Sequence, residues 1–267
     1  MASRFLEYYK RHVDELIHRL KVVFFTWLFL FIFFTAFPGN LFSGLTPEAF
    51  IEGTYTPLSI YLLNAMVNYT LSSPMASSVQ LDFIAGRISM GFEIWFMSAF
   101  LFSIMFSIPL LLYELWAFVK PGLYEHERRI IKENIFPIAL SFVGGILFGF
   151  FVIVPVIIRA FTIVIGWYEV KPVIYYQDFI NFILSTSLFV GIFMMIPTIV
   201  LTLIKAGILS SEPFRKYRFP LYVGVWIVSA IITPDGGFIG TTILALPFIV
   251  LFEIVLALAS RYEKRRQ

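Results

Sequence analysis

Three carboxylates stand inside or beside the long apolar segments of the chain, at Glu93, Glu114 and Glu253. An ionisable side chain costs at least a few kcal/mol near the centre of a membrane, so it is a functional candidate. Glu93 and Glu114 lie near opposite ends of one apolar segment, where their side chains can reach an interface. Glu253 lies deeper in its segment. Two readings stay open for it: a structural hydrogen-bond anchor or part of a water-lined site.

Other chemistry is missing from the sequence. There are no cysteines, which excludes disulfides, thiolate catalysis and Cys-ligated metals. His12, His18 and His126 lack a metal-like spacing with carboxylates, and the chain has no Gly-x-x-x-x-Gly-Lys-Ser/Thr phosphate loop. No Ser, His and Asp fall in a plausible common pocket. We therefore expect no enzyme, no cofactor, no metal site and no nucleotide hydrolysis.

The composition is that of a membrane protein. Of 267 residues, 59% are hydrophobic and only 14% charged, with a mean hydropathy of +0.86. A soluble domain carries about 25% charged residues. Residues 135–158 and 179–204 contain no Asp, Glu, Lys or Arg, and roughly 20 such residues cross the hydrocarbon core. A soluble enzyme, a disordered chain and a nucleic-acid binder are excluded.

Six apolar segments predict an all-α polytopic fold, because in lipid each span must satisfy its own backbone polar groups. The fifth segment has 15 residues and reaches about 22 Å, short of the roughly 30 Å core. It is expected to form a tight hairpin with the sixth, or to be extended by tilted or interfacial ends. The predicted spans are 22–37, 92–119, 135–158, 179–204, 219–233 and 238–260.

Seventeen of the 20 Lys and Arg residues fall on one side of this topology. The positive-inside rule then places both termini in the cytoplasm, with segment 1–21 before the first span and tail 261–267 after the last. Residues 39–91 form a long extracytoplasmic loop, in which 57–71 is expected to be a short packed or interfacial helix. The glycosylation sequon at Asn68 is best explained by chance.

Each span after the first contains a proline, and internal prolines bend helices. A bundle of bent helices favours a concave wall over a straight-sided plug, as transporters and channels also show. The prolines are Pro109, Pro155, Pro197, Pro220 and Pro247.

A more specific pattern follows the second span, where residues 116–129 read WAFVKPGLYEHERR. They closely resemble the W-x-F-x-x-P-x-L-x-x-x-E-R-R signature of TatC, the multi-spanning core of the twin-arginine protein translocase. Residues 12–20 resemble the family's N-terminal H-L-x-E-L-R-x-R-L segment. Positions in the third span, including Pro155, and in the final hairpin, including Thr233-Pro234-Asp235 and Leu251-Phe252-Glu253, resemble the family in the same order.

The resemblance implies a cup-shaped bundle of six spans with short fifth and sixth helices. It implies recognition of twin-arginine signal peptides on folded cargo, and transport with TatA/TatB-type single-span subunits in the cytoplasmic membrane, driven by the proton-motive force. A guanidinium pair needs carboxylates that accept bidentate hydrogen bonds. Glu127 matches the family's key carboxylate and Glu15 a second one. Other residues of the expected peptide site are Arg19, Phe118, Pro121 and Leu123.

Glu253, Asp235, Pro155 and Pro197 are expected to serve structure or partner contacts. Self-association, contact with membrane lipid and no binding of nucleic acid complete the expected partners. The competing interpretation of Glu127 is a surface or intrahelical pair with Arg128 or Lys132, worth under about 1 kcal/mol.

Two positions depart from the family pattern. Ile17 replaces an Arg of the N-terminal segment, and Met195 stands where members commonly place a Glu or Gln, two residues before Pro197. Thr198 and Thr202 are the nearby polar residues, and neither can ionise. We assign no intramembrane carboxylate to the fourth span.

Two other function classes remain. An ion-coupled secondary transporter of a small solute would show repeated halves and ionisable residues at the midplane, and neither is evident here. A structural subunit without a cargo site would leave Glu15 and Glu127 freely replaceable.

Overall fold

The fold was obtained as a computed structural model, which describes residues 2–39, 55–72, 82–168, 173–232 and 238–264. Its elements are helices apart from two strands of three residues each. The long helices are α1 (Ala2–Ala36), α4 (Met90–Val119), α5 (Glu125–Phe148), α7 (Tyr176–Ala206) and α10 (Phe238–Lys264). The shorter ones are α3 (Leu58–Ser72), α6 (Val154–Gly166), α8 (Glu212–Lys216) and α9 (Arg218–Ile232).

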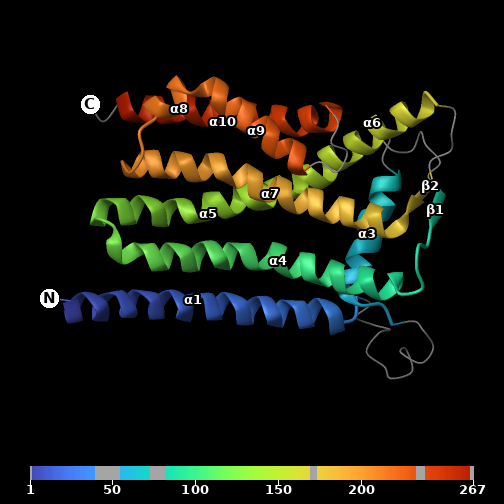
Figure 1. The fold of residues 1–267 in the computed structure, drawn as a ribbon, viewed down its shortest axis with the longest axis horizontal. Coiled ribbons are helices and arrows are strands. Elements are labelled where there is room, and N and C mark those ends of the chain that lie inside the picture. Colours follow the sequence, from blue (N-terminus) through green and yellow to red (C-terminus); the bar gives the residue numbers. More distant parts are fainter. Residues whose placement is uncertain (1, 40–54, 73–81, 169–172, 233–237, 265–267) are drawn as a thin grey trace.

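The five long helices lie side by side, and chain direction alternates along α1, α4, α5 and α7 (Figure 1). Both ends of the chain, the turn between α4 and α5 and the connection from α7 to α8 lie at one end of this bundle. These are the segments that carry the basic residues. The end with both termini is therefore the cytoplasmic end, and the all-α polytopic fold is confirmed.

Five of the described helical segments are long and apolar enough to cross a membrane, and the apolar helix from Arg218 to Ile231 is shorter. The predicted spans coincide with these helices with different bounds, and spans 22–37 and 219–233 each end one residue beyond their helices, α1 and α9. The first helix begins at Ala2, twenty residues before the predicted span, because the mixed-charge segment 1–21 continues the same helix. Spans two and four lie within α4 and α7, whose bounds exceed them by a few residues at one or both ends.

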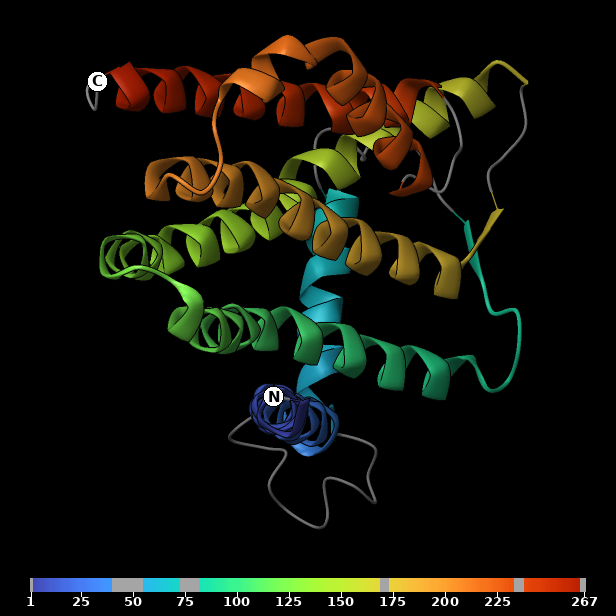
Figure 2. The same ribbon diagram turned by 60° about the vertical axis from the view of Figure 1, so that its left-hand side comes forward.

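The third span is not one straight helix. The α-helical hydrogen bonding of α5 gives way to a π-helical turn, η2 (Gly149–Ile153), and the chain continues as α6. Pro155 is the second residue of α6, just after this turn, and lacks the N–H that an uninterrupted α-helix would use. In Figure 2 α6 leaves the direction of α5 and runs towards α10. The helix reaches Gly166, eight residues beyond the predicted end at Ile158.

The closest packing in the bundle joins α5 to α7 through glycines. A Cβ on Gly145 would lie 2.8 Å from the Cα of Gly191, and one on Gly191 would lie 2.7 Å from the side chain of Ile146. Interfaces between membrane helices are enriched in small residues, which let the backbones approach closely. Phe142 and Val190 are fully buried beside this contact. Gly207, with φ 86°, ends α7 in the left-handed conformation that favours glycine.

Helix α1 packs on α4 through aromatic rings. Phe34 lies 5.8 Å from Phe102 and 5.3 Å from Phe106, measured between ring centroids. Nearer the cytoplasmic end, Trp27 meets Phe100 edge to face at 5.6 Å. This contact is made by large side chains, whereas the contact between α5 and α7 is made at glycines.

The packed helix expected within the long outer loop is present as α3, which crosses the bundle at its outer end (Figure 2). Leu63 and Val67 are its buried hydrophobic residues, and Tyr69 contacts Phe150 and Phe151 of η2. Beside it, β1 (Asp82–Ile84) pairs in parallel with β2 (Val173–Tyr175). This pairing of two outer loops was not expected from the sequence.

The last two helices, α9 and α10, pack against each other, and residues 233–237 between them lie outside the described part. The resemblance implied that both would be short. That is correct for α9, with 15 residues, and wrong for α10, with 27. The additional length of α10 lies at its cytoplasmic end, where Glu263 accepts the backbone N–H of Ser211 at 2.9 Å and also its hydroxyl.

Candidate functional site

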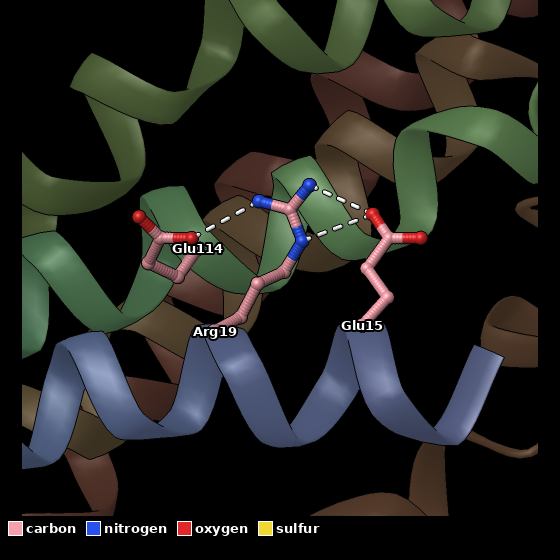
Figure 3. A network of polar contacts seen from close by, with 3 residues as sticks. All are labelled: Glu15, Arg19 and Glu114. Atoms are coloured by element: carbon pink, nitrogen blue, oxygen red, sulfur yellow. Dashed lines mark hydrogen bonds and ion pairs between the residues drawn. The ribbon is translucent and has the colours of Figure 1, made fainter. Parts of the chain in front are cut away.

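A guanidinium held between two carboxylates lies near the cytoplasmic end of α1 and α4. Nη2 and Nε of Arg19 donate to Oε1 of Glu15 at 2.8 and 3.2 Å, and Nη1 donates to Oε2 of Glu114 at 3.0 Å (Figure 3). One positive and two negative charges meet here, so the three side chains together carry one net negative charge. We call Glu15, Arg19 and Glu114 the charged triad.

The local sequence explains half of the triad. Glu15 and Arg19 are four residues apart on α1, which places them on one face with the carboxylate on the N-terminal side, the favourable order. Glu114 comes from α4, which runs antiparallel to α1. The side chains of Glu15, Arg19 and Glu114 are 34, 25 and 15% exposed, so Glu114 is the most shielded of the three.

Apolar side chains surround the triad. They line a narrow recess between α1 and α4 that Arg19 and Glu114 share with Leu16, Leu20, Val23, Leu111, Leu115 and Phe118. Phe118, expected at the peptide site, therefore adjoins Arg19. Charge-assisted hydrogen bonds are stronger than neutral ones, and partial exclusion of water strengthens them further.

Glu127 lies in the first turn of α5, at the same end of the bundle. Its Oε2 accepts the backbone N–H of Tyr124 at 3.0 Å, which caps the start of that helix. Among the described residues it forms no ion pair with Arg128 or Lys132, contrary to the competing interpretation. One oxygen of Glu127 thus serves the fold, and Oε1 has no partner in the described part of the chain.

The turn between the two helices presents the remaining expected residues. Pro121 is exposed in the 3₁₀ turn η1 (Lys120–Gly122), and Leu123, half-buried, follows it in extended conformation. Lys120 lies over the ring of buried Trp116 at 5.4 Å. The turn therefore continues the surface from the end of α4 to Glu127.

Glu253 joins α9 to α10. It accepts the hydroxyl of Tyr222, and its other oxygen lies 3.5 Å from Nη2 of Arg218. Of the two readings left open by the sequence, the structure supports the hydrogen-bond anchor.

The other expected residues lie away from the triad. Pro155 and Pro197 are buried within the bundle, and Asp235 lies outside the described residues. Glu93 is at the outer end, where it accepts from Gln177 at 2.6 Å and from Ser89 at 3.0 Å. The described residues contain no cluster of His, Asp and Glu that could hold a metal ion.

At the fourth-span position of Met195, the neighbouring polar groups are already used. Thr198 shares a hydrogen bond with Ser141 of α5 at 2.8 Å, and Thr202 donates to the carbonyl of Thr198. These hydroxyls tie α7 to α5 and to itself.

Sequence reasoning placed Glu114 near a helix end and missed its partner. The available signal was the spacing Leu111, Glu114, Leu115, Phe118, a face of α4 with one carboxylate among apolar residues. That pattern shows that something must compensate the charge, but only the register between α1 and α4 shows that it is Arg19.

Comparison with known proteins supports the family resemblance that the sequence motifs indicated. The model of the TatC family, Sec-independent protein translocase protein, matches residues 11–247. The chain is 27% identical over 258 residues to TatCy of Bacillus subtilis, covering 96% of this chain and 90% of that protein. It is 31% identical to TatC of Koribacter versatilis over 170 residues and 32% identical to TatC of Escherichia coli over 155. Those two matches span 61 and 59% of the relatives' lengths.

Two crystal structures of the twin-arginine translocase receptor TatC superpose on the fold with a TM-score of 0.70 each. They are 23 and 25% identical in sequence and cover 94 and 93% of this chain and 99% of theirs. The resemblance drawn from the motifs is confirmed by these matches. The chain belongs to the TatC family, the multi-spanning membrane proteins of Sec-independent protein translocation.

Proposed function

We propose that this chain recognises twin-arginine signal peptides at its cytoplasmic end. Together with single-span subunits it then transports folded proteins across the cytoplasmic membrane, driven by the proton-motive force and without enzymatic chemistry of its own. Self-association and contact with lipid belong to the same proposal.

The main support for this proposal comes from Glu15 and Glu127, the two carboxylates that match the family motifs. Glu15 and Glu127 lie at the same end of the bundle, and each uses one oxygen within the protein. Among the described residues, Oε2 of Glu15 and Oε1 of Glu127 accept no hydrogen bond. Two such oxygens suit two guanidinium groups on another chain.

The apolar surroundings support a peptide as the ligand. Phe118 and the leucines around the triad can contact the hydrophobic part that follows the arginines of a signal peptide. Pro121 and Leu123 shape the surface between Phe118 and Glu127.

Binding of a labelled peptide to the detergent-solubilised protein tests the proposal. A twin-arginine peptide should bind, and its twin-lysine version should bind at least about tenfold more weakly. A guanidinium can donate two N–H groups to one carboxylate oxygen, as Arg19 does to Oε1 of Glu15, whereas the lysine ammonium is a compact, strongly hydrated point charge. Glu127→Gln should likewise weaken binding of the twin-arginine peptide. Glu133→Gln is the matched control, since Glu133 lies exposed on the same helix and pairs only with Arg129 in the described part of the chain. Equal binding of both peptides would contradict the proposal.

A further inference from the structure

The hydrogen bonds of Arg19 are divided unevenly between its two carboxylates. Glu15 receives two of them, both on Oε1, while Glu114 receives the third on Oε2 (Figure 3). The second oxygen of Glu15 points away from Arg19. Arg19 therefore orients Glu15 without using both of its oxygens.

Glu114 sets the net charge of the triad in addition to joining α1 and α4. If Arg19 faced Glu15 alone, the pair would be neutral, and repulsion from Arg19 would offset much of the attraction of an arriving guanidinium to Glu15. With Glu114 present, the triad keeps one net negative charge, enough to attract one guanidinium. Because the recess is partly shielded from water, this charge is screened less than one on an open surface.

We propose that Glu114 is a positioning residue of the arginine site. It holds Arg19 from the α4 side and compensates its charge, so that Glu15 remains an acceptor for one guanidinium of the incoming peptide. This inference rests on the proposed function and extends it, since Glu114 acts through Arg19 and does not itself contact the peptide.

Three variants separate this role from simple packing. Glu114→Gln makes the triad neutral and should weaken binding of the twin-arginine peptide about fivefold, the upper end of the range for a partly exposed charge pair. Arg19→Gln leaves two negative charges and removes the side chain that orients Glu15, so binding should depend more steeply on salt than in the unmodified protein. The double variant restores one net negative charge and should return affinity to within about twofold of the unmodified protein.

The double variant also guards against misfolding. Arg19→Gln alone leaves the shielded Glu114 without its cation, which can destabilise the protein. The double variant places two neutral amides at these positions and leaves no unpaired buried charge. Thermal unfolding of each variant, measured beside binding, identifies a loss of affinity that is only a loss of fold.

The outcomes are distinct. Rescue of affinity in the double variant, with Glu133→Gln unchanged, supports the inference. Unchanged binding by Glu114→Gln, or an equal loss in all three variants, overturns it while leaving the proposed function intact. If the unmodified protein does not distinguish the arginine peptide from the lysine peptide, the proposed function itself fails.

Discussion

Two helix contacts in this bundle are built in opposite ways. Between α5 and α7, glycines bring the backbones together until no Cβ fits. Between α1 and α4, aromatic rings fill the contact, and three charged side chains occupy its cytoplasmic end. The first contact is fixed by the absence of side chains, and the second by large side chains that can rearrange.

The difference bears on where a binding site can form. In lipid, helix association depends on packing and polar contacts, since the tails are as apolar as the helices. Residues 135–158 and 179–204, which include the glycine contact, contain no charged side chain that could hold a guanidinium. The aromatic contact ends at Arg19 and Glu114 next to Phe118, around a recess of only about 10 Å³, so a ligand would bind on the surface beside these side chains and not between the helices. The contrast predicts that the two contacts respond differently to changes in volume.

The largest effect should come from adding volume to the glycine contact. In Gly145→Leu the new side chain would meet the backbone of Gly191 and the Cβ of Met194, both closer than 3.0 Å to its own Cβ. Neither can move without shifting α7, so we expect a loss of about 3 kcal/mol in the free energy of unfolding, or failure to recover folded protein. Thermal unfolding in detergent measures the change.

The neighbouring residue provides a matched control. A Cβ on Gly144 would meet nothing within 4 Å, so Gly144→Leu should leave the unfolding temperature within about 2 °C of the original. Equal loss in both variants would show that helix propensity or lipid contact, and not the glycine contact, sets the cost.

A reduction in side-chain volume at the aromatic contact should lower the free energy of unfolding by less than the added volume at the glycine contact does. Phe34 is 4% exposed and packs on Phe102 and Phe106. Phe34→Ala should lower the unfolding free energy by about 2 kcal/mol, less than in a water-soluble core because lipid tails can approach the gap. Phe34→Leu should cost less than half as much if the rings can rearrange. A Leu variant as unstable as the Ala variant would contradict that flexibility.

The sequence was sufficient for features that depend on composition along the chain. The uncharged segments such as 179–204 predicted helices, the basic residues predicted their direction, and the motif at residues 116–129 pointed to Glu127. Each of these is a local pattern with a physical cause that acts within one segment.

Features that depend on register between distant segments could not be predicted. Pro155 indicated a bend, but the π-helical turn before it consists of Gly149–Ile153, five residues with no breaker after the glycine. The pairing of β1 with β2 joins loops some 90 residues apart, and Glu114 finds Arg19 across 95 positions. Packing between helices decides all three.

A hydrogen bond at the outer end of the aromatic contact should contribute a smaller effect. Trp95 donates its indole N–H to the backbone carbonyl of Thr35 at 3.2 Å. Trp95→Phe keeps a ring and removes the donor, so we expect a loss of about 1 kcal/mol in unfolding free energy. Trp167→Phe is the control, because Trp167 is 71% exposed. A loss no larger than that of the control would show that ring packing alone holds this end.

The smallest effect should come from the hydroxyl pair that joins α5 to α7 near Met195. Ser141 and Thr198 share a hydrogen bond of 2.8 Å, and Ser141 also lies 2.9 Å from the carbonyl of Pro137 in its own helix. A hydroxyl has one hydrogen, so if Ser141 donates to that carbonyl, Thr198 must donate to Ser141. In Ser141→Ala, Thr198 can turn to a carbonyl of its own helix, and polar contacts between membrane helices average only about 0.6 kcal/mol. We expect a change of that size, against no measurable change in Ser260→Ala, whose hydroxyl bonds only within α10. A loss above about 2 kcal/mol would show that α5 and α7 depend on this pair as well as on their glycines, and the contrast between the two contacts would then be one of degree.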